Sequence, residues 1–102
     1  MEQPLTDHDP RRPDNGLPLV TVRYWAAARV AAGVAEETLP GGNVAEVLAA
    51  AVRSRPDDLR FERMLSISSV LVGEVPLGAR AGETVEVETG DVLEILPPFA
   101  GG

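Results

Sequence analysis

The 102-residue sequence contains no cysteine, no lysine and a single histidine, His8. Without cysteine there is no disulfide framework, no thiolate zinc site and no thiol nucleophile. A serine triad needs a histidine as its base, and a lone histidine in a proline-rich segment such as that around His8 is normally solvated. We therefore expect no metal site, and a chain that is not catalytic by itself.

Positive charge is scarce, and long apolar runs are missing. All nine basic residues are arginines, and 16 acidic residues bring the net charge to −7. Binding to nucleic acid or to an anionic membrane needs a basic face, so both partners are excluded. No apolar run approaches the ~20 residues that span a bilayer, and the N-terminus lacks a signal-peptide pattern. We expect a cytoplasmic protein.

The length fits one domain preceded by a short tail. Residues 1–18 contain four prolines and no apolar period, which predicts a disordered N-terminal tail. The domain is then expected to cover residues 19–102, with a flexible C-terminal tail over residues 97–102.

The first half of the domain predicts a strand pair followed by a helix. Residues 19–25 alternate, which favours a strand with Val20, Val22 and Tyr24 on the core face. The alanine-rich residues 26–32 predict a turn or a short helical piece closed by Gly33, and residues 34–39 a second strand.

A capped amphipathic helix begins after Asn43. The Asn43 side chain is a good N-cap, and Glu46 can reach back to the cap. The apolar stripe that follows has helical spacing: Val44, Val47, Leu48, Ala51 and Val52. A second, shorter helix is predicted from Asp57 and Asp58 through Arg63, with Met64 and Leu65 packed under it.

The second half of the domain is predicted to consist of strands. These are residues 68–72, a short edge strand at 75–77, residues 84–88 with Val85 and Val87 inward, and residues 92–96. The last strand is apolar on both faces except at Glu94, which indicates a central position. The order predicts an α+β fold of the β-grasp type: a mixed sheet of about five strands, its first and last strands parallel neighbours, with one main helix across it.

The C-terminus is the most distinctive part of the sequence. Pro97 and Pro98 would project the end away from the last strand, and Gly101 and Gly102 carry no side chain. Such an end can enter a narrow channel and present its carboxylate to another protein's active site. A carboxylate is a poor electrophile, but adenylation by a partner that uses ATP would activate it.

Two stretches resemble one family. VTVRYWAAARVAAGVAEETL (residues 20–39) and GDVLEILPPFAGG (residues 90–102) are similar to the MoaD/ThiS family of ubiquitin-like sulfur carriers, and most similar to its molybdopterin synthase branch. The resemblance implies a β-grasp fold over residues 20–102. The N-terminal tail and the 79–88 stretch are longer than the family usually needs.

The resemblance also implies a reaction cycle and its partners. Gly102 would be adenylated by an E1-like enzyme with ATP and converted by a sulfurtransferase to a thiocarboxylate. The chain itself would bind no cofactor. The tail would enter the large subunit of molybdopterin synthase, in a heterotetramer, and donate sulfur to a cyclic pyranopterin precursor. The residues of this inserted tail are Pro97, Pro98, Phe99, Ala100 and Gly101.

Exposed apolar residues on the sheet are expected to form the docking patch, with Leu71, Leu96 and Phe99 as candidates. Three other functions remain open from the sequence. They are a sulfur carrier for thiamine or cysteine biosynthesis, a ubiquitin-like modifier joined to a target lysine, and an interaction domain whose tail has no role.

Overall fold

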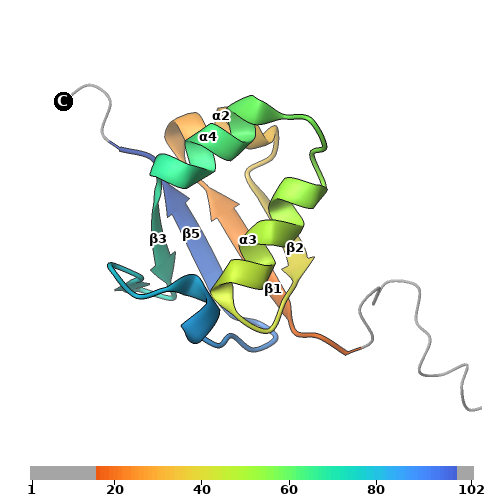
Figure 1. Cartoon of the computed structure of the whole chain (residues 1–102), viewed down its shortest axis with the longest axis vertical. Coiled ribbons are helices and arrows are strands. Elements are labelled where there is room, and N and C mark those ends of the chain that lie inside the picture. The colour runs from red at the N-terminus through yellow and green to blue at the C-terminus, as the bar shows by residue number, and fades with distance from the viewer. Residues whose placement is uncertain (1–15, 99–102) are drawn as a thin grey trace, which may run out of the picture.

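The computed structural model describes residues 16–98, and its secondary structure follows the predicted order closely (Figure 1). The predicted N-terminal tail lies outside the described residues up to position 15. The elements in chain order are β1 (Leu19–Tyr24), α2 (Ala26–Ala32), β2 (Glu36–Pro40), α3 (Val44–Arg53), α4 (Leu59–Ile67), β3 (Ser69–Val72), β4 (Val75–Pro76), the 3₁₀ turn η1 (Gly82–Thr84) and β5 (Val92–Leu96).

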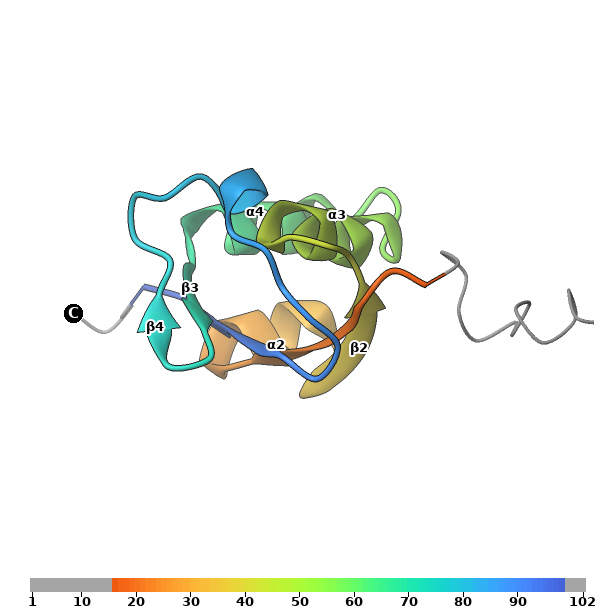
Figure 2. The ribbon, with the colours of Figure 1, turned by 90° about the horizontal axis from the view of Figure 1, so that it is seen from below.

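The five strands form one mixed sheet in the order β2-β1-β5-β3-β4. Strand β5 is central, as predicted, and pairs in parallel with β1 and antiparallel with β3. Helices α3 and α4 cover one side of this sheet (Figure 2). Helix α2 packs beside α4 at the end of the sheet where β1 and β5 end. This is the β-grasp arrangement expected from the sequence, with α3 as the main helix and the shorter helices α2 and α4 beside it.

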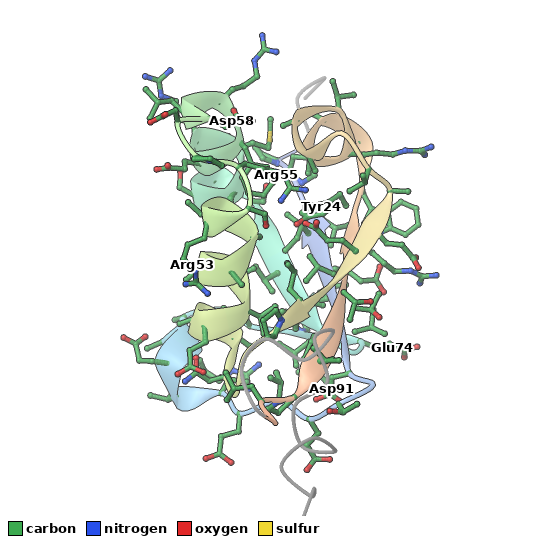
Figure 3. All side chains as sticks on the ribbon, turned by 90° about the vertical axis from the view of Figure 1, so that its right-hand side faces the viewer. Tyr24, Arg53, Arg55, Asp58, Glu74 and Asp91 are labelled. Atoms are coloured by element: carbon green, nitrogen blue, oxygen red, sulfur yellow. The ribbon has the colours of Figure 1, made fainter. Side chains whose placement is uncertain are left out.

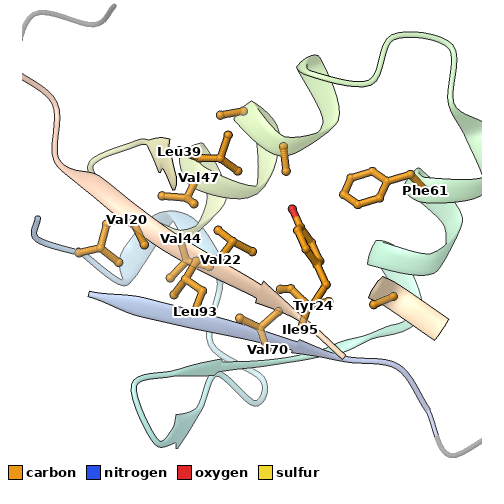
Figure 4. Packing of buried hydrophobic residues seen from close by; sticks show 14 residues of the cluster. Val20, Val22, Tyr24, Leu39, Val44, Val47, Phe61, Val70, Leu93 and Ile95 are labelled. Atoms are coloured by element: carbon orange, nitrogen blue, oxygen red, sulfur yellow. The ribbon is translucent and has the colours of Figure 1, made fainter. Parts of the chain in front are cut away.

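The core lies between the sheet and the helices (Figure 4). Val20, Val22 and Tyr24 are buried, so the predicted core face of β1 is confirmed. From the helical layer the core receives Val44, Val47 and Phe61. Phe61 is 1 % exposed and contacts the Tyr24 ring edge-on, with ring centroids 5.8 Å apart. The sequence patterns had not marked Phe61 as a core residue.

Local signals account for the helix boundaries. Asn43 Oδ1 accepts the Glu46 N–H at 2.8 Å, as predicted for an N-cap, whereas Glu46 Oε1 accepts the N–H of Gly42, one residue before the cap. Gly33 ends α2 in the left-handed conformation, with φ at 83°. Gly41 is required for space, because a Cβ there would lie 2.6 Å from Val47 Cγ2.

Two sequence predictions are wrong in detail. The second helix does not stop at Arg63 but continues to Ile67, so Met64 and Leu65 are part of α4. These two residues lie three and four positions after Phe61 and extend its apolar stripe. The helix begins as the acidic residues indicated, because Asp58 Oδ1 accepts the Phe61 N–H at 3.0 Å.

Residues 84–88 do not form a sheet strand. Both edges of β5 are already occupied by β1 and β3, so this segment instead bonds to the chain just before α3. The Val87 N–H donates to Gly42 O, and the Val44 N–H donates to Val85 O. The predicted alternation still holds, because Val87 is buried and Val85 packs against the core.

Candidate functional site

The tail leaves the sheet from the end of its central strand (Figure 1). Pro97 follows Leu96 and is half-buried, and Pro98 is exposed. Neither proline has an N–H to extend the strand ladder, so pairing stops here. The predicted tail residues Phe99, Ala100 and Gly101, and the predicted acyl site Gly102, lie outside the described residues.

Leu71 and Leu96 both lie on the sheet face opposite the helices. Their neighbours Val70 and Ile95 point into the core, and side chains alternate along a strand. The register pairs Leu71 with Glu94, two residues before Leu96, so the two leucines are diagonal neighbours. Both are half-buried, and no described helix covers them.

Trp25 adds to this face and was missed as a site residue. Trp25 is 46 % exposed, and its Nε1–H donates to Glu94 Oε1 at 2.9 Å. Its backbone N–H donates to Ile95 O at 3.1 Å, close to the start of the tail. The signal was present in the sequence, because Trp25 shares the alternation of Thr21 and Arg23, away from the core.

We call the outward-facing surface around β5 the open face and define it by five residues. They are Trp25, Leu71, Val92, Glu94 and Leu96, and Arg23 of β1 lies beside them with its partner Glu36. Arg23 Nε lies 3.3 Å from Glu36 Oε1, and both side chains are about half exposed. The open face is thus a small apolar surface with one carboxylate inside it, next to the start of the tail.

A polar cluster lies between the sheet and the helices, near the end of β1 (Figure 3). Tyr24 Oη donates to Glu37 Oε2 at 2.6 Å, and Arg55 Nη2 lies 2.8 Å from the same oxygen. Burial, together with the Glu37 carboxylate, raises the pKa of Tyr24 above its ordinary range. Arg55 also lies over the Phe61 ring, 4.4 Å from its centroid. Each group here has a partner within the fold, so the cluster is structural.

Within residues 16–98, no group of three or more His, Cys, Asp or Glu side chains is placed to hold a metal ion. Over the same residues, no helix is long and apolar enough to cross a membrane.

The chain was compared with known proteins at the level of sequence and of structure. No protein-family model matches it, and neither does any curated protein sequence. Among solved structures it is similar to small archaeal modifier protein 1 of Methanosarcina acetivorans, with 23% identity and a TM-score of 0.71 over 85% of this chain and 99% of that one. It is also similar to a chain of the Amycolatopsis orientalis BexX/CysO complex, with 29% identity and a TM-score of 0.64 over 81% of this chain and 99% of that one.

A third similar structure is the complex of subunits 1 and 2 of the Helicobacter pylori molybdopterin-converting factor. One of its chains matches with 19% identity and a TM-score of 0.58, over 82% of this chain and 99% of that one. These neighbours have the ubiquitin-like β-grasp fold, and the fold class is thereby confirmed. The resemblance to the MoaD/ThiS family of ubiquitin-like sulfur carriers is confirmed as well.

Proposed function

We propose that this chain is a ubiquitin-like sulfur carrier and that Gly102 carries the sulfur. The observation that supports this most directly is the junction between fold and tail. The central strand of a β-grasp sheet ends at Leu96 and continues at once into Pro97-Pro98 and the sequence Phe-Ala-Gly-Gly. The fold then acts as a handle that partners recognise, and the chemistry occurs on the terminal carboxyl group.

The chemistry follows from the weakness of a carboxylate as an electrophile. Attack of the Gly102 carboxylate on ATP in an activating enzyme forms an acyl-adenylate and releases pyrophosphate. A persulfide sulfur displaces AMP, and reductive cleavage of its S–S bond by a thiol leaves a thiocarboxylate. The thiocarboxylate is the better nucleophile, and after it has donated its sulfur the tail returns to a carboxylate.

Within this class we propose the molybdopterin branch, with sulfur donated to a cyclic pyranopterin precursor in the cytoplasm. The partners would be the large synthase subunit, an E1-like adenylating enzyme and a sulfurtransferase. The tail Pro97-Pro98-Phe99-Ala100-Gly101 would enter the large subunit, and the open face would dock beside it. Because the chain carries a net charge of −7, basic groups on the partners suit both the tail and the docking surface.

Intact-mass spectrometry tests the carrier chemistry. The full chain is incubated with ATP, the activating enzyme, a persulfide donor and a reducing thiol, and the mass is expected to rise by the replacement of one oxygen by sulfur. Omission of ATP is the matched control. An unchanged mass in the complete mixture would contradict the proposal.

A second candidate keeps the carrier chemistry but supplies thiamine or cysteine biosynthesis, and similarity to the CysO complex favours it. A third is a protein modifier, favoured by similarity to small archaeal modifier protein 1. Gene deletion followed by complementation separates the pathways. A deletion strain that loses molybdoenzyme activity and no other function assigns the molybdopterin branch. Thiol-resistant adducts of higher mass on a denaturing gel would assign the modifier.

A further inference from the structure

Glu94 lies in the middle of the open face, not at its margin. Along β5 it lies between Val92 and Leu96, which point to the same side of the sheet. Across the sheet its register partners are Arg23 on β1 and Leu71 on β3. A partner that covers the two leucines will therefore also cover Glu94.

The fold satisfies only part of this carboxylate. Trp25 Nε1–H is the one hydrogen-bond donor that the described residues place on it, at Oε1. Arg23 is its neighbour in the register, but the Arg23 side chain is bonded to Glu36. Glu94 thus reaches the surface as a half-buried anion whose second oxygen depends on water.

Docking would remove that water. Burial of a carboxylate with incomplete pairing is unfavourable and opposes the gain from the surrounding apolar contacts. A donor that enters with the partner removes this cost and adds a charge-assisted hydrogen bond. A partner without such a donor is rejected by the same carboxylate.

We propose that Glu94 selects the docking partner, and that the partner surface covering the open face is apolar with one arginine or lysine placed against Glu94. The inference rests on the proposed function, because it needs a partner that docks beside the tail. Trp25 holds the carboxylate in place through its indole N–H. The occupant is therefore a protein surface with a basic residue at its centre, not a uniformly apolar one.

Calorimetric titration of the full chain into the large synthase subunit of the same organism tests this. Glu94→Gln keeps an oxygen to accept the Trp25 N–H but loses the charge, and we expect binding to weaken about 30-fold. Glu62→Gln is the matched control, since it removes the same charge from α4 on the other side of the sheet. Its affinity should stay within about threefold, as for a charge outside the interface.

The Glu94→Leu variant shows whether the charge of Glu94 strengthens or weakens binding of the partner. On a purely apolar partner this variant would bind more tightly, whereas a partner that presents a cation would be left with a buried unpaired charge and bind at least 30-fold more weakly. Thermal unfolding of each variant confirms that the fold is kept, and Glu94→Gln carries the test if Glu94→Leu does not fold.

Besides tighter binding of Glu94→Leu, three results with the glutamine variants would overturn the inference. One is wild-type affinity in Glu94→Gln, and another is an equal loss in Glu62→Gln. The third is a dimer of the chain alone that Glu94→Gln dissociates, because the open face would then belong to a second copy.

A wild-type chain that becomes thiocarboxylated but does not bind the large subunit counts against this inference and leaves the carrier proposal standing. An unchanged mass in the activation assay counts against the carrier itself.

Discussion

Tyr24 is the only tyrosine of the chain. The residue is 2 % exposed, and its hydroxyl donates to the Glu37 carboxylate. Ionisation would place a phenolate in an apolar site beside that carboxylate, and the raised pKa of Tyr24 follows from this. Because lysine and cysteine are absent, no other side chain titrates between about pH 9 and 12. The change of folding stability between these pH values therefore reports on the ionisation of Tyr24.

The first prediction concerns the hydroxyl proton of Tyr24. The folded state holds this proton to higher pH than the unfolded state, so its contribution to stability is fully present below the unfolded pKa of about 10. The free energy of unfolding then falls as pH rises above that value, by up to about 1.4 kcal/mol per pH unit. Urea unfolding at successive pH values measures this slope. Tyr24→Phe should lower stability at neutral pH by about 1 kcal/mol and remove the slope. A slope that persists in Tyr24→Phe would contradict this assignment.

At the same scale, the candidate site was only partly visible in the sequence. Leu71 and Leu96 could be named from alternation, because each is flanked by inward-facing apolar residues. The hydrogen bond between Trp25 and Glu94 could not, since it joins residues 69 positions apart and depends on the parallel register of β1 and β5. Pairing across such a distance is decided by the assembled sheet, not by local pattern.

Helices α2, α3 and α4 are joined at one point by Arg55. Its Nε–H donates to Ala32 O at the end of α2, and its Nη1–H donates to Ala51 O in the last turn of α3. The third nitrogen pairs with Glu37 of β2, and the guanidinium plane lies over Phe61 of α4. A planar group with several fixed donors can serve all these elements at once, whereas an ammonium cannot.

Arg55→Lys is accordingly expected to destabilise the fold by about 2 kcal/mol although the charge is kept. Arg53→Lys is the matched control, because Arg53 is exposed at the end of α3, and its effect should stay within about 0.5 kcal/mol. Urea denaturation measures both. Equal stabilities for the two variants would show that Arg55 acts only through its charge.

The elements themselves were largely predictable from the sequence, and the exceptions share a cause. The strand β1, the cap at Asn43 and the central strand β5 are set by local period and local hydrogen bonds. Residues 84–88 have the alternation of a strand, but β5 is flanked on both sides and this segment bonds instead to the chain around Gly42 and Val44. Local pattern fixes which side chains face the core, and topology decides where the backbone finds its partners.

At the scale of the whole molecule, the fold and the proposed reaction occupy separate parts of the chain. Among residues 16–98, the buried core extends from Val20 to Ile95, and the last sheet pairing involves Leu96, just before Pro97. The predicted N-terminal tail, residues 1–18, precedes that core in the same way. Stability and carrier activity should therefore respond to different truncations.

Deletion of Gly102 alone tests this separation. The free energy of unfolding measured with urea should stay within about 0.5 kcal/mol of the wild-type value, because the core of the described residues is built from positions 20 to 95. Thiocarboxylate formation, followed by intact mass, should be lost, since the activating enzyme must reach the carboxyl group at a fixed distance from the docked open face. Deletion of residues 1–15 is the control and should leave both measurements unchanged. A Gly102 deletion that still gains sulfur would move the acyl site to another residue, while one that unfolds would show that the tail supports the fold.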